Sequence, residues 1–600
     1  MSGNSQEKLR AEDGGRQQAE VIAAGKMPLL GTMLIGAGIC ALLTLPMAWA
    51  VRHLISGDGG SYLEMATNSL KLGPSYLFSN GYWSPGYPLL IAIVLKLLNP
   101  GWASELIAVH VLDWLICSVS YLTFTYFFFH LLLWAERGRT TEPRSETDRW
   151  GAGRLPIVVF GYTLVLIANM DISLWIVGPV MLMEGLVYLA AGLALRLGMK
   201  GARPIHHVLL GLTLAAGYMA KAPMLPMGLA LLAFLFVWPL DARMKRKGAL
   251  LAAAAFILGI LPVVISLSVA KGRPTFGDSG RLNYAWYVDE ISRDVVWNPA
   301  LPGGATLTHP AEILANDPPI RKFASIGNAT FPYWYDPSVW YEGLQAKFHL
   351  KMQVWQYLRA LGLREKVMVG GGGTTLEGLA LRWTPVWAGM AAFVLLGFRA
   401  RNIIQILGRQ IWLLFWPLTA LWMFSSVLLE YRYLTGFLVL GSITLVVATW
   451  RSMGEKKSAG ILLTVAVGLL LMYAPVLAKG ILLGDWGGPW GQGQNEALGN
   501  LAGIEELREL GIGSGNELAS INFPTISYPA HLLGAKCDIQ VLAKDPARFA
   551  ELPAPDVERI LNLLRAHGAK ALVSGTGRPG FKNDIGWIRL NNTTFIRMLN

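Results

Sequence analysis

Residues 27–50 read MPLLGTMLIGAGICALLTLPMAWA and carry no charged side chain. A run of about twenty apolar residues is what an α-helix needs to cross a hydrocarbon core about 30 Å thick. Similar runs recur along the 600-residue chain, in which 53% of the residues are hydrophobic and only 15% are charged. Soluble domains carry about 25% charged residues. The sequence therefore predicts a polytopic α-helical membrane protein.

About eleven runs have the length and composition of membrane spans. The segment 89–98 is also apolar, but it is short and bracketed by prolines, which favours an interfacial or re-entrant position. The predicted spans are 27–50, 105–134, 155–173, 175–197, 206–220, 223–240, 249–270, 381–398, 411–427, 433–449 and 460–483.

Basic residues gather in short segments between these spans, a pattern typical of the cytoplasmic side. The net charge of +12 therefore reports topology, and we expect no nucleic-acid partner. The polar tail 1–26 is then cytoplasmic, whereas the loops 51–104 and 271–382 and the tail 484–600 lie outside. The basic clusters include Arg137, Arg139, Arg144, Arg149 and Arg154; Arg196, Lys200 and Arg203; Arg243, Lys245, Arg246 and Lys247; Arg399, Arg401 and Arg409; and Arg451, Lys456 and Lys457.

The two long outer regions differ in character. Loop 271–382 contains RLNYAWYVDE and FPYWYDPSVWYEG, whose dense aromatics argue against disorder, so we expect it to fold over the outer face. The tail 484–600 has helical spacing at Val557–Leu564, ended by Gly568, and strand patterns in LASINF and KALVSG. WIRLNNTTFIRML is typical of a hairpin. A small extramembrane α/β domain is predicted there.

Three cysteines are present, and Cys40 and Cys117 lie within apolar runs. Neither their number nor their placement indicates a disulfide framework or a metal-ligand spacing. The sequence therefore indicates no cofactor, and it leaves open whether a divalent metal ion assists.

The stretch SGDGGSYLEMA places Asp58 between glycines shortly after the first span. Gly-Asp-Gly-Gly is an ordinary turn, and Asp is an ordinary turn or N-cap residue. The other interpretation is a catalytic base at the outer face.

Lys221 ends the run GLTLAAGYMAKAPMLPMGL, at a hairpin that opens on the same side as Asp58. A lysine at a helix end can simply extend its ammonium to the headgroup layer. Since few other cations belong to outer turns, a phosphate-binding role is the alternative.

The segment SSVLLEYRYLTGFLVL places Glu430, Arg432 and Tyr433 in another outer turn. Glu430 and Arg432 could neutralise each other, and exposed pairs of this kind contribute only about 0–1 kcal/mol. An arginine facing the headgroups also suits a phosphate, which its planar fork binds through two hydrogen bonds.

Glu184 stands inside an apolar run, where a charge must pair or face a wet cavity. A structural ion pair and a role at the site are both open. We include Glu184, Glu430, Tyr433 and Tyr62 among the residues expected to support a site. Several tryptophans and tyrosines could stack on a sugar ring, and the sequence does not distinguish which.

The order of an acidic first loop, WSPGYPLL, AGYMAKAP and LEYRYL resembles the GT-C superfamily of polyprenyl-phosphate-sugar-dependent glycosyltransferases. The pattern is closest to the branch with protein O-mannosyltransferases and lipid A aminoarabinose transferases, and it covers residues 27–449. The first-loop acid of that family matches Asp58, and its proline-rich segment matches Pro85–Pro88. Many relatives have paired acids in the first loop or a Lys/His-Pro-Pro-Leu segment. This chain has one Asp58 and reads SPGYPLL.

The resemblance implies an inverting glycosyltransferase in the plasma (inner) membrane, with its site on the periplasmic or extracellular side. Asp58 would take a proton from an acceptor hydroxyl as it attacks the anomeric carbon. Lys221 and Arg432 would stabilise the departing phosphate. The donor would be a polyprenyl-phosphate sugar, and the acceptor a glycan, a lipid or a protein.

Two other function classes remain open from sequence. A transporter or flippase of lipid-linked glycans is expected to have internal repeats and helices broken near the midplane, and neither is evident. A non-catalytic scaffold in envelope assembly would not need Asp58.

Overall fold

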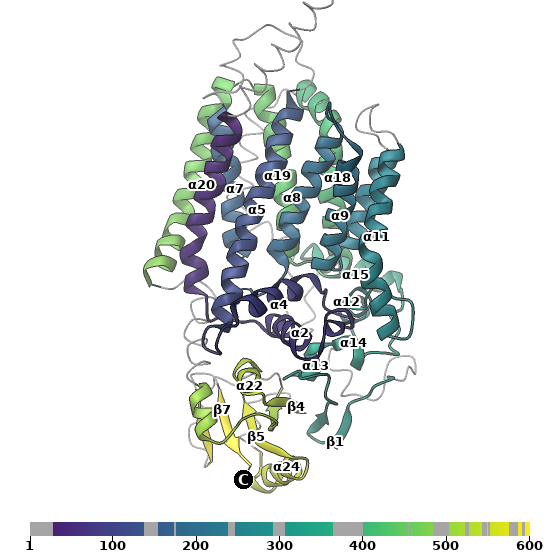
Figure 1. Ribbon diagram of the computed structural model, residues 1–600, viewed down its shortest axis with the longest axis vertical. Coiled ribbons are helices and arrows are strands. Elements are labelled where there is room, and N and C mark those ends of the chain that lie inside the picture. The colour runs from purple at the N-terminus through teal and green to yellow at the C-terminus, as the bar shows by residue number, and fades with distance from the viewer. Residues whose placement is uncertain are drawn as a thin grey trace, which may run out of the picture.

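Long helices stand side by side as a bundle, and the strands of the C-terminal region lie beyond one end of it (Figure 1). The computed structural model describes residues 28–136, 154–172, 176–237, 246–291, 307–363, 400–453, 455–483, 503–522, 527–542, 549, 552–574, 586–590 and 594–599. The predicted tail 1–26 and the predicted span 381–398 lie outside these residues.

The other ten predicted spans coincide with helices. Six described helices are long and apolar enough to cross a membrane, namely Pro28–Ala50, Glu105–Ala135, Val180–Leu197, Arg246–Ala270, Tyr431–Arg451 and Ser458–Pro475. The predicted multi-pass helical architecture is confirmed. The bundle comprises Pro28–Ala50, α5 (Glu105–Ala135), α7 (Leu155–Ile172), α8 (Val180–Leu197), α9 (Pro204–Ala220), α10 (Met224–Val237), α11 (Arg246–Ala270), α18 (Ala400–Val427), α19 (Tyr431–Met453) and α20 (Glu455–Leu483).

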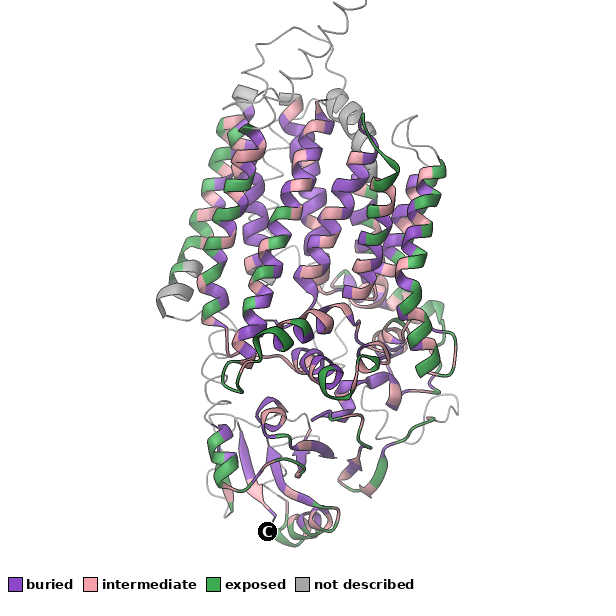
Figure 2. Ribbon diagram, in the orientation of Figure 1, coloured by how far each residue is buried: buried purple, intermediate pink, exposed green. Residues whose placement is uncertain are grey.

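Burial separates the central helices from the peripheral ones (Figure 2). α8 and α19 are mostly buried, whereas Pro28–Ala50 and α11 expose large aliphatic side chains such as Leu42 and Leu258. A helix that is apolar on every face and exposed on one of them suits contact with lipid chains. Successive spans alternate in direction, so Arg154, at the start of α7, lies beside Glu136, at the end of α5, and pairs with it.

A layer of short helices covers the lower end of the bundle in Figure 1. α4 lies there, across the ends of the long helices, as the short proline-bracketed run predicts. The layer comprises α2 (Gly57–Leu72), α3 (Ser75–Phe78), α4 (Gly86–Leu98), α12 (Ser279–Tyr287), α13 (Pro332–Tyr335), α14 (Pro337–Trp340) and α15 (Leu350–Ala360).

A seven-stranded sheet of order β1-β2-β4-β3-β5-β7-β6 lies beyond this layer. β3 is parallel to β4 and β5, and the remaining neighbours are antiparallel. Helices α22 (Ser527–Leu533) and α24 (Ala554–Ala566) belong to this region, as does a helix at 503–509. The strands are β1 (Glu312–Asn316), β2 (Pro319–Lys322), β3 (Glu517–Ile521), β4 (Lys536–Val541), β5 (Ala569–Ser574), β6 (Trp587–Arg589) and β7 (Phe595–Met598).

The sheet draws strands from both outer regions. β1 and β2 come from the loop after α11, and β2 pairs with β4 so that Ile320 faces Val541. The predicted strands in LASINF and KALVSG and the helix ended by Gly568 are present as β3, β5 and α24. β6 and β7 form the predicted antiparallel pair, although its turn residues Asn591–Asn592 lie outside the described residues. The loop is therefore joined to the α/β region through this sheet.

Candidate functional site

A cavity of about 550 Å³ lies where α2 meets the α9–α10 and α18–α19 turns. Six of the seven predicted site residues line it, although they come from three distant parts of the chain. These residues are Asp58, Tyr62, Lys221, Glu430, Arg432 and Tyr433. All three parts lie at the same end of the bundle, where their side chains line one cavity.

Asp58 stands in the first turn of helix α2, so the stretch around it is a helix start and not an isolated turn. Ser56 is the N-cap, and its hydroxyl oxygen accepts the N–H of Gly59 at 3.1 Å. A Cβ at Gly59 would lie 2.9 Å from the Cβ of Val177, so only glycine allows this close approach. The carboxylate is therefore carried on a capped and packed helix end, where the helix dipole also favours negative charge.

The Asp58 carboxylate has a different neighbour on each oxygen. The Trp334 indole N–H donates to Oδ1 at 3.2 Å, and Nη2 of Arg432 lies 3.8 Å from Oδ2. One third of the side chain is exposed. The group is therefore oriented by Trp334, with free acceptor capacity toward the cavity.

Lys221 follows the last residue of α9, and its extended backbone ends that helix. Its Nζ lies 4.1 Å from the ring centroid of Tyr433, a cation–π contact. Within the described residues, no carboxylate pairs with it directly. A Cβ at Gly86 would lie 2.8 Å from the carbonyl oxygen of Met219, so the start of α4 packs closely against this helix end.

Burial is the main influence on Lys221, and it lowers the pKa of the ammonium group to about 7. The charge of Arg432 contributes to this lowering, and the charges of Asp58 and Glu430 oppose it. An anion entering the cavity would favour the charged form.

Arg432, at the start of α19, lies between two carboxylates without bonding either closely. Its Nε is 3.8 Å from Oε2 of Glu430, and its Nη2 is equally far from Asp58. Hydrogen bonds of this type are 2.7–3.2 Å long. The buried Nε finds no hydrogen-bond partner among the described residues. A buried N–H without a partner is costly, so a ligand that accepts from it would be bound favourably.

Tyr62 contributes an aromatic surface to the cavity. Its buried ring makes edge-on contacts with Trp83 at 5.1 Å and with Tyr87 at 5.5 Å between centroids. Burial raises the pKa of Tyr62 well above its ordinary value, so the phenol stays neutral.

An aromatic wall that the sequence could not single out completes the cavity. It consists of Tyr82, Trp83, Tyr287 and Trp334. The carbonyl of Trp334 accepts from the Trp83 indole at 3.1 Å and from the Ser61 hydroxyl at 2.9 Å. Trp334 is thereby tied to α2 through Ser61 and to the segment before α4 through Trp83. The aromatic density of FPYWYDPSVW was the available signal, but it does not distinguish Trp334 from its neighbours.

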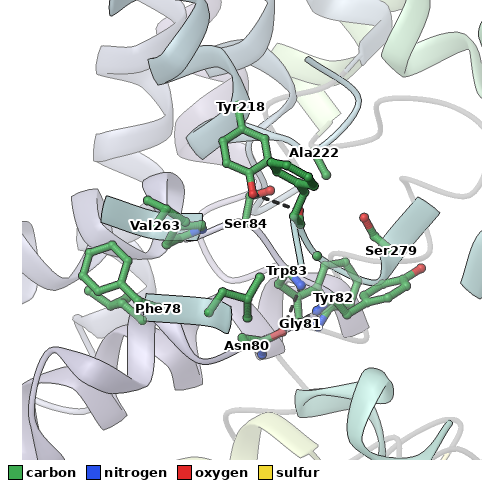
Figure 3. Close-up of a pocket in the computed structure, with 15 residues that line it drawn as sticks. Phe78, Asn80, Gly81, Tyr82, Trp83, Ser84, Tyr218, Ala222, Val263 and Ser279 are labelled. Atoms are coloured by element: carbon green, nitrogen blue, oxygen red, sulfur yellow. Dashed lines mark hydrogen bonds between the residues drawn. The ribbon is translucent and has the colours of Figure 1, made fainter. Parts of the chain in front are cut away.

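A smaller pocket of about 20 Å³ lies beside this wall (Figure 3). The side-chain oxygen of Asn80 accepts the backbone N–H groups of Tyr82 at 3.0 Å and Trp83 at 2.9 Å. This turn sets the direction of both rings. The Tyr218 hydroxyl donates to the carbonyl of Phe276 at 2.8 Å, which ties α9 to the loop after α11.

Glu184 is not brought to the cavity. It is buried in α8, where the Tyr188 hydroxyl donates to Oε1 at 2.6 Å. With the Asn169 amide turned to donate, its nitrogen lies 2.9 Å from both carboxylate oxygens. Gly436 of α19 packs directly against this side chain. The arrangement is that of a structural contact between helices. Throughout the described ranges, no group of three or more His, Cys, Asp or Glu side chains is arranged to hold a metal ion.

No protein-family model matches the chain, and no curated protein matches it. Among solved structures, the chain is similar to ArnT from Cupriavidus metallidurans bound to undecaprenyl phosphate. The TM-score is 0.48 and the identity 12%, over 95% of this chain and 98% of that chain. It is also similar to AglB, the oligosaccharyltransferase of Archaeoglobus fulgidus, in complex with an inhibitory peptide and a dolichol-phosphate. That TM-score is 0.45 and the identity 12%, over 91% of this chain and 69% of that chain.

Proposed function

We propose that the protein is an integral-membrane glycosyltransferase that moves a sugar from a polyprenyl-phosphate donor to an acceptor hydroxyl at the outer face of the membrane. The observation that carries this proposal is the cavity, which joins one oriented carboxylate with two cations. In the part of the chain that the structure describes, neither cation has a carboxylate within hydrogen-bond distance. A base and an anion site in one enclosed space are the two elements that transfer from a sugar phosphate requires.

The donor phosphate occupies the space between Lys221 and Arg432. Both cations contact the Tyr433 ring, Lys221 Nζ at 4.1 Å and Arg432 Cζ at 5.0 Å from its centroid. Arg432 supplies the Nε that has no hydrogen-bond partner among the described residues, and Lys221 supplies an ammonium group whose charge a phosphate would stabilise. The two side chains therefore bind the ground-state phosphate and, more strongly, the charge that develops as it leaves.

An apolar flank of the same cavity suits the polyprenyl chain. It is formed by α10 and by the end of α18. The side of α18 that faces away from the bundle exposes Trp422 and Leu418. An isoprenoid placed there would leave the cavity toward the lipid while its phosphate stays at the bundle end. The flank consists of Leu225, Pro226, Met423, Phe424 and Val427.

The reaction is a direct displacement at the anomeric carbon. The acceptor oxygen forms a bond to that carbon, and its proton passes to the Asp58 carboxylate. The bond from the anomeric carbon to the phosphate oxygen breaks, and its electron pair leaves with the polyprenyl phosphate toward Lys221 and Arg432. Attack opposite the leaving group inverts the anomeric configuration. General-base assistance of this kind typically contributes 10²–10⁴-fold to the rate.

The test is a transfer assay on the full chain in proteoliposomes, with a panel of polyprenyl-phosphate sugars and with glycan, lipid and peptide acceptors. We expect one donor to give a glycosylated product of inverted configuration, and Asp58→Asn to lose it. The exposed acid Asp556 on α24 provides a control variant, Asp556→Asn, that should keep full activity.

The outcome against the proposal is equally specific. If the protein moved the intact lipid-linked sugar between leaflets and formed no product with any acceptor, it would be a flippase and not a transferase.

A further inference from the structure

Helix α22 joins the C-terminal sheet to the layer that carries Asp58 (Figure 1). Its residues Tyr528 and Leu532 pack into the hydrophobic core of the helical bundle. Ala530 and Leu533 are buried in the core of the sheet. Because α22 belongs to both cores, a change in its position alters the packing of both the bundle and the sheet.

His531 of α22 lies between two carboxylates of the membrane region. Its Nδ1 is 3.6 Å from Oε1 of Glu64, and its Nε2 is 3.5 Å from Oε1 of Glu105. Glu64 belongs to α2, six residues after Asp58, and Glu105 begins α5. Only 12% of the histidine side chain is exposed, and the Tyr528 ring stacks beside it at 6.2 Å.

We propose that His531, as an imidazolium bridging Glu64 and Glu105, is a positioning residue. It holds α2 in the position that places Asp58 in the cavity. The docking of the C-terminal domain thereby sets the activity of Asp58. The effect on transfer rests on the proposed function, whereas the effect on α2 does not.

The bridge is stabilised by the attraction between the imidazolium of His531 and the two carboxylates. Glu64 and Glu105 come from different helices and converge on one buried point, where two carboxylates without a cation repel each other. Among the described residues, the other titratable groups near this point are Tyr528 on α22 itself, Tyr335 of the outer loop and Cys537 of β4, the last two close to Glu64. None of these three supplies a positive charge.

The pKa of His531 supports the same assignment. Burial alone would lower it, but the nearby carboxylates of Glu105 and Glu64 raise it to about 9, against an ordinary value of 6.5. A group whose folded pKa is raised stabilises the contact fully below its ordinary pKa, and this stabilisation is lost as the pH rises through the folded value. The bridge is therefore intact at neutral pH and opens above about 9.

A second connection runs parallel to the bridge. The other contact of Glu64 is the backbone N–H of Thr330, which donates to Oε1 at 2.8 Å. The carbonyl of Thr330 accepts from Cys537 in β4 at 2.6 Å. Four residues later Trp334 donates to Asp58. Loss of the bridge would thus loosen α2 near its middle and disturb the segment that orients Asp58.

The experiment compares wild type, His531→Gln, His531→Arg and the control His567→Gln, whose ring bonds the carbonyl of Leu563 on its own helix. Hydrogen exchange of the α2 peptide is measured at matched pH between 7 and 10, and transfer is measured in parallel. We expect His531→Gln to speed α2 exchange at pH 7.5 and to lower kcat more than the donor KM. Above pH 9, α2 of the wild type should exchange as fast as α2 of His531→Gln. In His531→Arg, α2 should exchange slowly at every pH.

The size of the effect follows from the pKa change. A rise from 6.5 to about 9 corresponds to a docking equilibrium weakened on the order of 10²-fold when the proton is lost. Addition of Glu105→Gln to His531→Gln should restore part of the protection, since it removes the repulsion between the two carboxylates.

Two failures are distinguishable. Equal α2 exchange in wild type and His531→Gln at pH 7.5, with no change in wild type up to pH 10, would overturn the bridge. If His531→Gln fails to fold, the wild-type pH series and His531→Arg decide the matter. Absence of transfer with every donor would remove the proposed function and leave the exchange result standing.

Discussion

The indole N–H of Trp334 donates to the Asp58 carboxylate at 3.2 Å, across 276 residues of sequence. Trp334 is itself held by Trp83 and Ser61, so the orientation of the carboxylate depends on the fold of the outer loop. A hydrogen bond to a charged group contributes about 1.5–3 kcal/mol.

Trp334→Phe keeps the ring and removes this donor. We expect kcat to fall about ten- to hundredfold while the donor KM stays within a factor of about three, because the change alters the orientation of the base and not the phosphate site. Steady-state kinetics of sugar transfer measures both quantities. Trp340→Phe is a matched control, since Trp340 bonds the carbonyl of Pro332 and does not contact Asp58. An unchanged kcat in Trp334→Phe would refute the orienting role.

The lowered pKa of Lys221 leads us to expect that donor binding depends on pH. Its pKa is lowered to about 7, chiefly by burial, so the free protein loses this positive charge as the pH rises through neutrality. The second ionisation of a phosphate monoester is complete above its pKa of about 6. We therefore expect the affinity for undecaprenyl phosphate to weaken from pH 7 to 9 in wild type and to stay level in Lys221→Arg.

Titration calorimetry checks the lysine directly. Binding at pH 8 should take up a proton in wild type, seen as a dependence of the heat on the buffer's ionisation enthalpy, and Lys221→Arg should lose this dependence. Lys570 of β5 is half-buried and does not line the cavity, so Lys570→Arg is a control that should behave as wild type. Proton-independent binding by wild type would mean that Lys221 does not face the phosphate.

Because Glu184 lies away from the cavity, we expect a change at its hydrogen bond to affect stability and not activity. Tyr188→Phe removes the donor to its buried carboxylate, so we expect a loss of about 1–3 kcal/mol in the free energy of unfolding. Turnover per folded molecule should change less than about threefold, because neither residue lines the cavity. Thermal unfolding in detergent and single-turnover rates test the two halves. A large fall in turnover with unchanged stability would indicate that Glu184 acts at the functional site.

Much of the architecture could be predicted from the sequence because a bilayer imposes a simple rule. Each apolar run must form a helix, and charge placement then orders the turns. The same rule brought Asp58, Lys221 and Arg432 to one end of the bundle before any contact was known. Glu184 was the exception, since burial alone does not say whether a carboxylate faces a cavity or its helix neighbours.

Local signals failed where tertiary contacts decide. Glycines made the Asp58 stretch resemble a turn, but the Ser56 cap and the packing of Gly59 on Val177 stabilise a helix there. β1 and β2 are short and flanked by prolines, and the partner of β2 lies about two hundred residues later. Trp334 was one of many aromatic residues, and His531 carried no motif at all.

Asp58 and Glu430 provide the most direct test of the central claim. Both carboxylates lie 3.8 Å from Arg432, so they affect the phosphate site alike, but only Asp58 is proposed as the base. The measurement is kcat together with the dissociation constant of undecaprenyl phosphate for Asp58→Asn and Glu430→Gln. We predict that Asp58→Asn lowers kcat 10²–10⁴-fold with donor binding no weaker than in wild type, and that Glu430→Gln keeps kcat within tenfold. Normal turnover by a folded Asp58→Asn protein, or equal losses in both variants, would contradict the account.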